Sequence, residues 1–171
     1  MYIYKMKHYS HATLIGDAHT GKSSFVKRLL GNNLLTNYDD QHNIEHVEFT
    51  QYDSNNNMIT TYFVDVPANS SMTFHYLEKP ESVIIFCDHT KLDTLESAIG
   101  WIDFINKNIL CYLIVTKIDL EEDDGFDDLL GENSDKFKKV FRVSLKNMQL
   151  NEIQLKDIIL LINYDILDTK N

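Results

Sequence analysis

The sequence predicts an α/β fold: a mostly parallel six-stranded sheet with one antiparallel edge strand and helices on both faces. Short apolar runs typical of strands alternate with segments of helical periodicity along the 171 residues. Two strand-like runs follow each other across a polar, Asn-rich link, which is typical of a hairpin and would supply the antiparallel edge. A glycine-containing loop separates the first strand from the first helix, as expected where a strand turns directly into a helix.

These patterns give the expected elements in chain order. The first strand lies within residues 6–15, and Gly31 ends the first helix. The other expected strands are 45–52, 58–66, 82–87, 109–115 and 139–143, and the expected helices are 23–31, 92–105 and 150–162. Residues 34–43 form a polar connection, and the acidic stretch 119–128 is expected to be a solvated loop.

Residues 16–23 read Gly-Asp-Ala-His-Thr-Gly-Lys-Ser, a complete phosphate-binding loop of the form G-x-x-x-x-G-K-[ST]. Its place between a strand and a helix favours a nucleotide site over the alternative of a glycine-rich turn with a solvated lysine. Lys22 would reach the β- and γ-phosphates, and the Ser23 hydroxyl would bind Mg²⁺. The residues expected around the phosphates are Gly16, Asp17, Ala18, His19, Thr20, Gly21, Lys22, Ser23 and Ser24. The sequence therefore predicts a P-loop NTPase fold.

Composition limits the other possibilities. The length favours a single domain over residues 1–171, and the net charge of −10 argues against nucleic-acid binding. Cys87 and Cys111 lie in apolar stretches and are expected to be core residues. The chain shows no signal peptide, no apolar run of about 20 residues and no lipidation motif. We therefore expect a cytoplasmic protein without a membrane anchor of its own.

Three polar motifs follow strand-like runs, at the edge where ligands bind in such sheets. Asp65 follows residues 62–64 and could hold Mg²⁺ through water. Thr116-Lys117-Ile118-Asp119 follows the run 113–115, and Ser144-Leu145-Lys146 follows 140–143.

The order phosphate loop, D-x-x-[G], [NT]-K-x-D and S-x-K resembles a small GTPase of the Ras superfamily over essentially the whole chain, and residues 82–101 look closest to the Rab branch. The resemblance implies GTP or GDP with Mg²⁺ as ligands. Asp119 would accept two hydrogen bonds from guanine, and Lys117 would lie along the base plane and brace the phosphate loop. Ser144, Leu145 and Lys146 would close over the base. Thr116 stands where most of the family has Asn.

The chain departs from the family where the γ-phosphate would be sensed and cleaved. The family's Asp-x-x-Gly-Gln reads Asp65-Val-Pro-Ala-Asn, so Ala68 replaces the glycine and Asn69 replaces the glutamine that orients the attacking water. Asn69 offers the same amide one methylene short. Pro67 stiffens the segment.

The switch threonine of the family has no counterpart at the expected positions 41–43, and Thr36 lies several residues early. Leu34 stands where an aromatic residue packs on guanine. Ala18 stands at a position that is often glycine, where a side chain can obstruct an arginine finger.

Three functions are compatible with these motifs. The first is a guanine-nucleotide switch with slow GTP hydrolysis that engages effector or regulator proteins. The second is a binding module that uses nucleotide structurally or not at all and holds a partner protein through residues 34–80. The third, a small-molecule kinase, is disfavoured because Arg28 and Arg142 are the only arginines.

Overall fold

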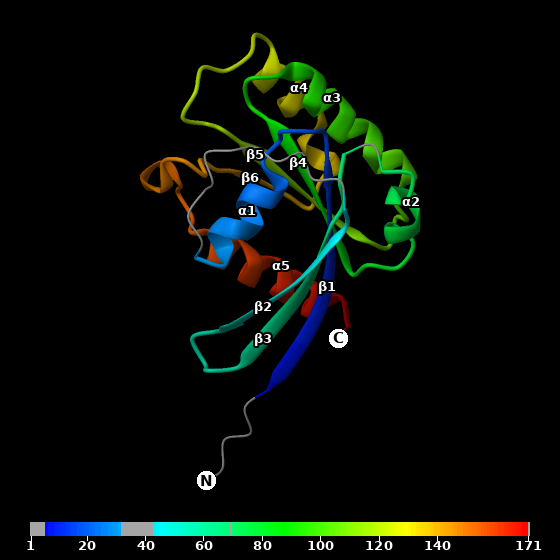
Figure 1. The fold of residues 1–171 in the computed structure, drawn as a ribbon, viewed down its shortest axis with the longest axis vertical. Coiled ribbons are helices and arrows are strands. Elements are labelled where there is room, and N and C mark those ends of the chain that lie inside the picture. The colour runs from blue at the N-terminus through cyan, green and yellow to red at the C-terminus, as the bar shows by residue number, and fades with distance from the viewer. Residues whose placement is uncertain (1–5, 32–42, 69, 171) are drawn as a thin grey trace.

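The computed structural model describes residues 6–31, 43–68 and 70–170, and its centre is a six-stranded sheet in the order β2-β3-β1-β4-β5-β6 (Figure 1). Neighbouring strands run parallel except β2 and β3, which pair antiparallel and place β2 at the edge. The predicted fold class is therefore confirmed. The strands are β1 (Lys7–Gly16), β2 (Glu45–Tyr52), β3 (Met58–Asp65), β4 (Ser82–Asp88), β5 (Leu110–Thr116) and β6 (Lys139–Arg142).

Helices cover both faces of the sheet and create two apolar cores (Figure 1). The α-helices are α1 (Lys22–Leu29), α2 (Thr73–Tyr76), α3 (Leu92–Trp101), α4 (Phe126–Asn133) and α5 (Leu155–Lys170), and short 3₁₀ turns are η1 (Ile102–Phe104), η2 (Ser134–Lys136) and η3 (Met148–Leu150). On one face α1 and α5 pack on the sheet, and on the other α3 and α4 do so. Every residue of β4 is buried, as its continuous apolar run predicts for a central strand.

The structure corrects the predicted helix boundaries. The helix expected over 92–105 ends at Trp101, and η1 continues the apolar spacing with a different backbone. The helix expected over 150–162 begins only at Leu155, and it runs on to Lys170. The hairpin is confirmed: Asp53 Oδ1 accepts from the backbone N–H of Asn55 and Asn57, which closes the turn.

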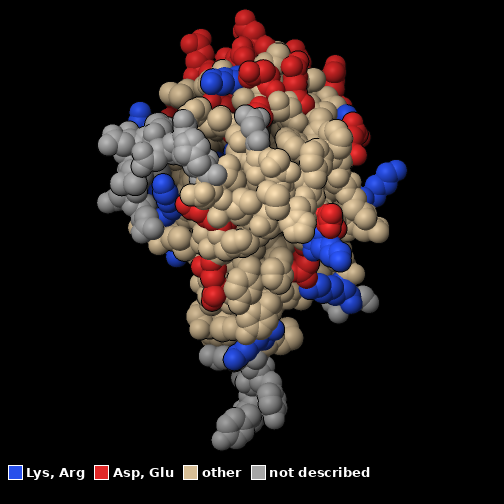
Figure 2. Space-filling model, turned by 45° about the vertical axis from the view of Figure 1, so that its right-hand side comes forward, with Lys and Arg blue, Asp and Glu red and all other residues tan. Residues whose placement is uncertain are grey.

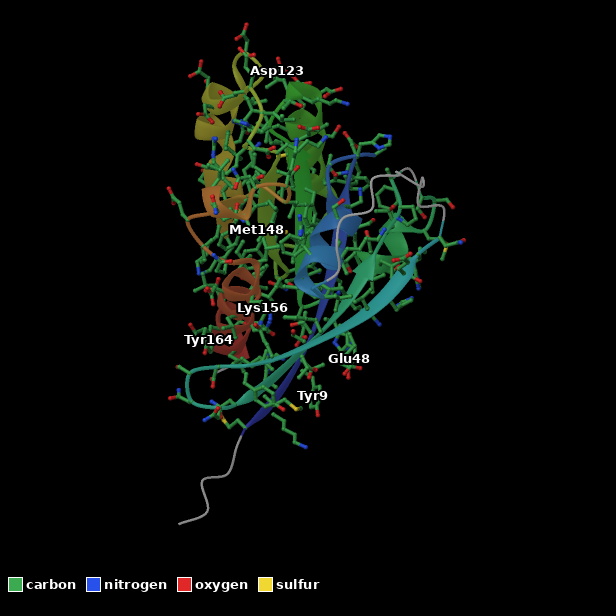
Figure 3. All side chains as sticks on the ribbon, turned by 60° about the vertical axis from the view of Figure 1, so that its left-hand side comes forward. Tyr9, Glu48, Asp123, Met148, Lys156 and Tyr164 are labelled. Atoms are coloured by element: carbon green, nitrogen blue, oxygen red, sulfur yellow. The ribbon has the colours of Figure 1, made fainter. Side chains whose placement is uncertain are left out.

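The hairpin turn lies beside α5 near Tyr164 (Figure 3). The Tyr164 hydroxyl donates to Asp53 Oδ2 of this turn at 3.3 Å. Both cysteine thiols are free: Cys87 is buried and Cys111 is half-buried, so the prediction that they are core residues holds best for Cys87. Within the described ranges, no helix is long and apolar enough to cross a membrane.

Candidate functional site

The phosphate-loop motif forms the turn between β1 and α1, and the structure explains why both of its glycines are needed. Gly16 has φ +141°, and a Cβ there would overlap the carbonyl oxygen of Phe86 on the neighbouring strand β4. Gly21 has φ +93°, and a Cβ there would lie 3.3 Å from side-chain atoms of both Leu145 and Thr116. The loop therefore fits against the ends of β4 and β5 because it carries glycine at these two positions.

Lys22 lies inside the loop with 6% of its surface exposed. Its Nζ donates to the backbone oxygens of Gly16 at 2.6 Å and of Asp17 at 2.8 Å. Burial lowers the pKa of Lys22, while the nearby carboxylates of Asp65 and Asp17 oppose that shift. The Thr20 hydroxyl also donates to the Asp17 oxygen, at 2.8 Å, so the loop is closed around a buried ammonium group.

The two residues predicted to hold Mg²⁺ border this loop. Asp65 ends β3, is 1% exposed and pairs in register with Leu14 of β1, two residues before the loop. Ser23 lies in the first turn of α1. Carboxylate and hydroxyl oxygens are ligands that Mg²⁺ accepts, so this pair fits a Mg²⁺ ion held partly by phosphate and water.

Beside the loop lies a pocket of about 260 Å³. Eight predicted site residues and one that sequence reasoning missed, Leu120, line it: His19, Gly21, Ser24, Thr116, Lys117, Asp119, Leu120, Leu145 and Lys146. The motifs at 116–119 and 144–146 are thus brought together against the loop, as their positions after β5 and β6 predict. Leu120 directly follows the predicted motif, and this position is the one feature of the sequence that could have indicated its place in the pocket.

Asp119 is held by the segment that follows β6. The Ser144 hydroxyl donates to Asp119 Oδ1 at 2.6 Å, and the backbone N–H of Asn147 donates to the Ser144 hydroxyl at 2.7 Å. The backbone N–H of Ser144 donates to Asn151 Oδ1 at 2.7 Å. Asn151 therefore belongs to the segment that supports Ser144, and α5 begins only after it, at Leu155.

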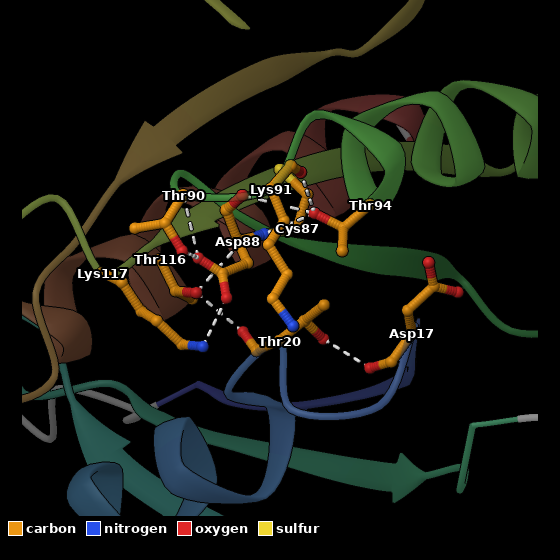
Figure 4. Close-up of polar contacts among 9 residues, drawn as sticks. All are labelled: Asp17, Thr20, Cys87, Asp88, Thr90, Lys91, Thr94, Thr116 and Lys117. Carbon is orange, nitrogen blue, oxygen red and sulfur yellow. Dashed lines mark hydrogen bonds and ion pairs between the residues drawn. The ribbon is translucent and has the colours of Figure 1, made fainter. Parts of the chain in front are cut away.

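Thr116 connects the phosphate loop to the sheet. Its hydroxyl lies 2.7 Å from the Thr20 oxygen and 3.1 Å from the Cys87 oxygen, so its proton can reach either one (Figure 4). Arg28 of α1 makes a second connection, since its Nε donates to the Leu145 oxygen at 2.9 Å. Sequence reasoning missed this contact.

Lys117 pairs with Asp88, which sequence reasoning also missed (Figure 4). Lys117 has φ +62°, and its ammonium contacts Asp88 Oδ2 at the end of β4. Burial alone would raise the pKa of Asp88, but the Lys117 ammonium and hydrogen bonds from Thr90 outweigh it and hold the pKa below its usual range. Asp88 itself could have been singled out, because it ends an apolar run just as Asp65 does, but the sequence does not indicate its pairing with Lys117.

Thr36, Gln41, His42 and Asn69, which were considered for the γ-phosphate side, lie outside the described part of the chain. Leu34, which was considered for the edge of the guanine base, lies outside it as well. The segment after Asp65 is described as far as Ala68. The Val66 N–H donates to the Leu14 oxygen at 3.2 Å, and both Val66 and Pro67 are buried. This part of the chain is anchored on the sheet.

Acidic side chains gather at one end of the molecule (Figure 2), where Asp123 of the stretch 119–128 lies (Figure 3). Most of this stretch is exposed, as predicted, but it is not a loop throughout, because α4 begins at Phe126. Asp123 Oδ2 accepts from the Leu92 N–H at 2.8 Å and so caps α3. The stretch also leads into α4, a helix that was not predicted, through Gly125 at φ +79°.

Next to it, His89 Nε2 lies 2.7 Å from Glu122 Oε2, and Arg142 pairs with Asp127. The ligand atoms of His89, Glu122 and Asp127 lie within 4.8 Å of one another. An Arg142 nitrogen lies 3.4 Å from His89 Nε2, so a guanidinium already supplies positive charge to these carboxylates. We interpret the group as an ion-pair cluster that fixes the acidic stretch.

Comparison with known proteins gives one result that bears on this site. The model of the family described as "Ras of Complex, Roc, domain of DAPkinase" matches residues 11–119, which is more than half of the chain and runs from β1 through Asp119. No curated protein matches the chain. The match supports the resemblance to the Ras superfamily, and the finer likeness to the Rab branch stays a prediction.

Proposed function

The chain belongs to the Roc family of Ras-like GTP-binding domains, and we propose that it is a guanine-nucleotide switch that binds GDP and GTP with Mg²⁺ and hydrolyses GTP slowly. The observation that carries this proposal is the pocket beside the phosphate loop. Its wall contains a carboxylate, Asp119, which the Ser144 hydroxyl holds in place.

The pocket fits guanine because of the hydrogen bonds that this carboxylate can accept. Guanine offers an N1–H and an exocyclic amine side by side, and adenine offers no such pair at that edge. A site built around such bonds rejects a base that lacks them by about 10⁴-fold or more. The Lys117 side chain would lie along the base, and Ser144, Leu145 and Lys146 would close over it.

The phosphates would lie over the β1–α1 turn. The backbone N–H groups of the loop and the N-terminus of α1 favour negative charge there, and the Lys22 ammonium would turn from its backbone acceptors to the β- and γ-phosphates. Ser23 and Asp65 would hold the Mg²⁺ ion, which neutralises charge on those phosphates.

Slow hydrolysis follows from the segment after Asp65. Ala68 and Asn69 replace the residues that contact the γ-phosphate and orient water, and the buried Val66 and Pro67 restrict how far the segment can swing. Without a well-placed glutamine, intrinsic rates in this class are about 10⁻⁴ s⁻¹ or less, and we expect a rate at or below that value.

The first test measures which nucleotide the protein retains on purification and its affinities for GDP, a GTP analogue, IDP and ADP by calorimetry. GDP should bind far more tightly than ADP, and IDP, which lacks the exocyclic amine, should bind more weakly than GDP. Asp119→Ala should abolish the preference, whereas Asp135→Ala, an exposed carboxylate on η2, should not. Equal binding of GDP and ADP would contradict the proposal.

The buried Val66 and Pro67 also favour a second candidate function. In it, the chain is a binding module that keeps one conformation and holds a partner protein through the surface of residues 34–80. Hydrogen exchange in that segment separates the two. Different patterns with GDP and a GTP analogue support a switch, and identical patterns support the module.

A further inference from the structure

We propose that Asp88 is a positioning residue for guanine-nucleotide binding, because its carboxylate holds the Lys117 ammonium at the wall of the pocket. The inference rests on the proposed function and adds a residue outside the four sequence motifs that carry it.

The geometry gives the two carboxylate oxygens of Asp88 separate tasks (Figure 4). Oδ1 accepts from the backbone N–H of Thr90 at 2.9 Å and from the Thr90 hydroxyl at 2.8 Å. Oδ2 contacts the Lys117 ammonium. Asp88 is 1% exposed and pairs in register with Thr116, the residue before Lys117. One oxygen therefore fixes the turn after β4, and the other reaches across to the pocket.

The long side chain of Lys117 has many rotamers, and an ion-pair partner reduces their number before the ligand binds. A free lysine side chain loses rotamer freedom when a ligand orders it, and this loss weakens binding. The ion pair with Asp88 orders the side chain beforehand. An ammonium that pairs with Asp88 is also less available to Asp119, which lines the same pocket and is the proposed acceptor for guanine.

Asp88→Asn tests this arrangement with almost no change of shape. The amide oxygen can keep both bonds from Thr90, while the amide NH₂ faces the Lys117 ammonium as a second donor. We expect GDP affinity to fall about tenfold to a hundredfold, the usual effect of losing a hydrogen bond to a charged group. Thr90→Val is the matched control, because it removes a bond to Asp88 and leaves the ion pair intact; its affinity should stay within about threefold of wild type, well below the loss expected for a charged pair.

A double-mutant cycle separates positioning from a general effect on the fold. Lys117→Met should also weaken GDP binding, and Asp88→Asn should add nothing further in that background. If Asp88 acted only on the fold, the two losses would add. The ratio of GDP to IDP affinity should stay unchanged in Asp88→Asn, because in the proposed function the exocyclic amine of guanine donates its hydrogen bond to Asp119.

Thermal unfolding of the nucleotide-free variants shows whether each one folds. If Asp88→Asn does not fold, Asp88→Glu and Asp88→Gln form a second pair of equal size, in which Glu must bind GDP more tightly than Gln. Provided that the wild type binds GDP, three results would each overturn the inference. They are an unchanged GDP affinity of Asp88→Asn, additive losses of affinity in the double mutant, and equal GDP affinities of Asp88→Glu and Asp88→Gln. Absence of GDP binding by the wild type would instead overturn the proposed function, and this inference with it.

Discussion

Replacing Gly16 with alanine is expected to destabilise the fold strongly, although the change adds one methyl group. Gly16 ends β1 with φ +141°, a conformation that residues with a side chain rarely adopt. A Cβ there would overlap the carbonyl oxygen of Phe86 and lie 3.2 Å from the carbonyl carbon and the Cβ of that residue. The obstacle is backbone in the middle of a paired strand, so it cannot move aside as a flexible side chain would.

The magnitude follows from two costs. A strained backbone conformation costs about 1–3 kcal/mol, and forcing an extra carbon into a packed region costs about 1–3 kcal/mol. Together they amount to about 2–6 kcal/mol, a large part of the roughly 5–15 kcal/mol that stabilises a typical domain. For a chain of this size, the melting temperature should fall by roughly 5–20 °C.

Thermal unfolding followed by circular dichroism measures this effect in the nucleotide-free protein, which separates it from any loss of ligand binding. Gly100→Ala is the matched control, because Gly100 lies in α3 with no atom within 4 Å of an added Cβ. That variant should be unchanged or more stable by about 0.5–1 kcal/mol, since alanine is the better helix former. For a chain of this size, a change of about 2 °C in melting temperature corresponds to roughly 1 kcal/mol or less. If Gly16→Ala melts within about 2 °C of the wild type, the backbone overlap does not destabilise the fold and the reasoning is wrong.

Three further predictions follow from contacts of single residues. Ser144→Ala removes the hydroxyl that donates to Asp119, so calorimetry should show GDP affinity reduced about tenfold or more; unchanged affinity would show that the contact does not orient the carboxylate. Burial raises the pKa of Cys111 to about 11 and that of Cys87 further, so at pH 8 both thiols should react with a disulfide reagent about a hundredfold or more slower than in the urea-unfolded chain; equal rates would contradict their burial. The pKa of Asp88 lies below its ordinary value because the Lys117 ammonium and the hydrogen bonds from Thr90 together outweigh burial, so its carboxylate stabilises the fold above about pH 4 and this contribution is lost as the pH falls through the lower folded-state pKa. Urea unfolding at a series of pH values should therefore show a smaller loss of stability below pH 4 for Asp88→Asn than for the wild type, and parallel losses would be inconsistent with this assignment.

The sheet could be predicted from sequence because its signals are local. The run that forms β4 is apolar at nearly every position, which is typical of a strand covered on both faces. The helix α4 could not be predicted in the same way. Only Phe126 and Leu130 are buried in it, and the acidic side chains around them dominate the composition. The start of α5 was predicted too early because the apolar pattern continues through residues that the loop after β6 uses.

The candidate site was predicted to the extent that it consists of short motifs at strand ends. Thr116, Lys117 and Asp119 could be placed beside the phosphate loop because parallel strands end at one edge of the sheet. The pairing of Asp88 with Lys117 joins residues 29 positions apart, and no local pattern indicates which carboxylate meets which ammonium. Such partners become visible only when the sheet order and register are known.

The base pocket and the segment after Asp65 are supported by different contacts. We therefore expect substitutions in one to change nucleotide affinity and substitutions in the other to change GTP hydrolysis. Asp119 is held by Ser144, and Thr116 lies against the phosphate loop at Thr20, so the base pocket and the loop are linked before any ligand binds. The segment after Asp65 is instead fixed to the sheet through Val66 and lacks the residues that would position water. If the proposed function is right, nucleotide affinity would depend on contacts of the base pocket, and hydrolysis would depend on a segment that those contacts do not reach. Ser144→Ala should accordingly lower GDP affinity without changing the rate of hydrolysis at saturating GTP, whereas Ala68→Gly should change the conformational response to GTP with little effect on GDP affinity.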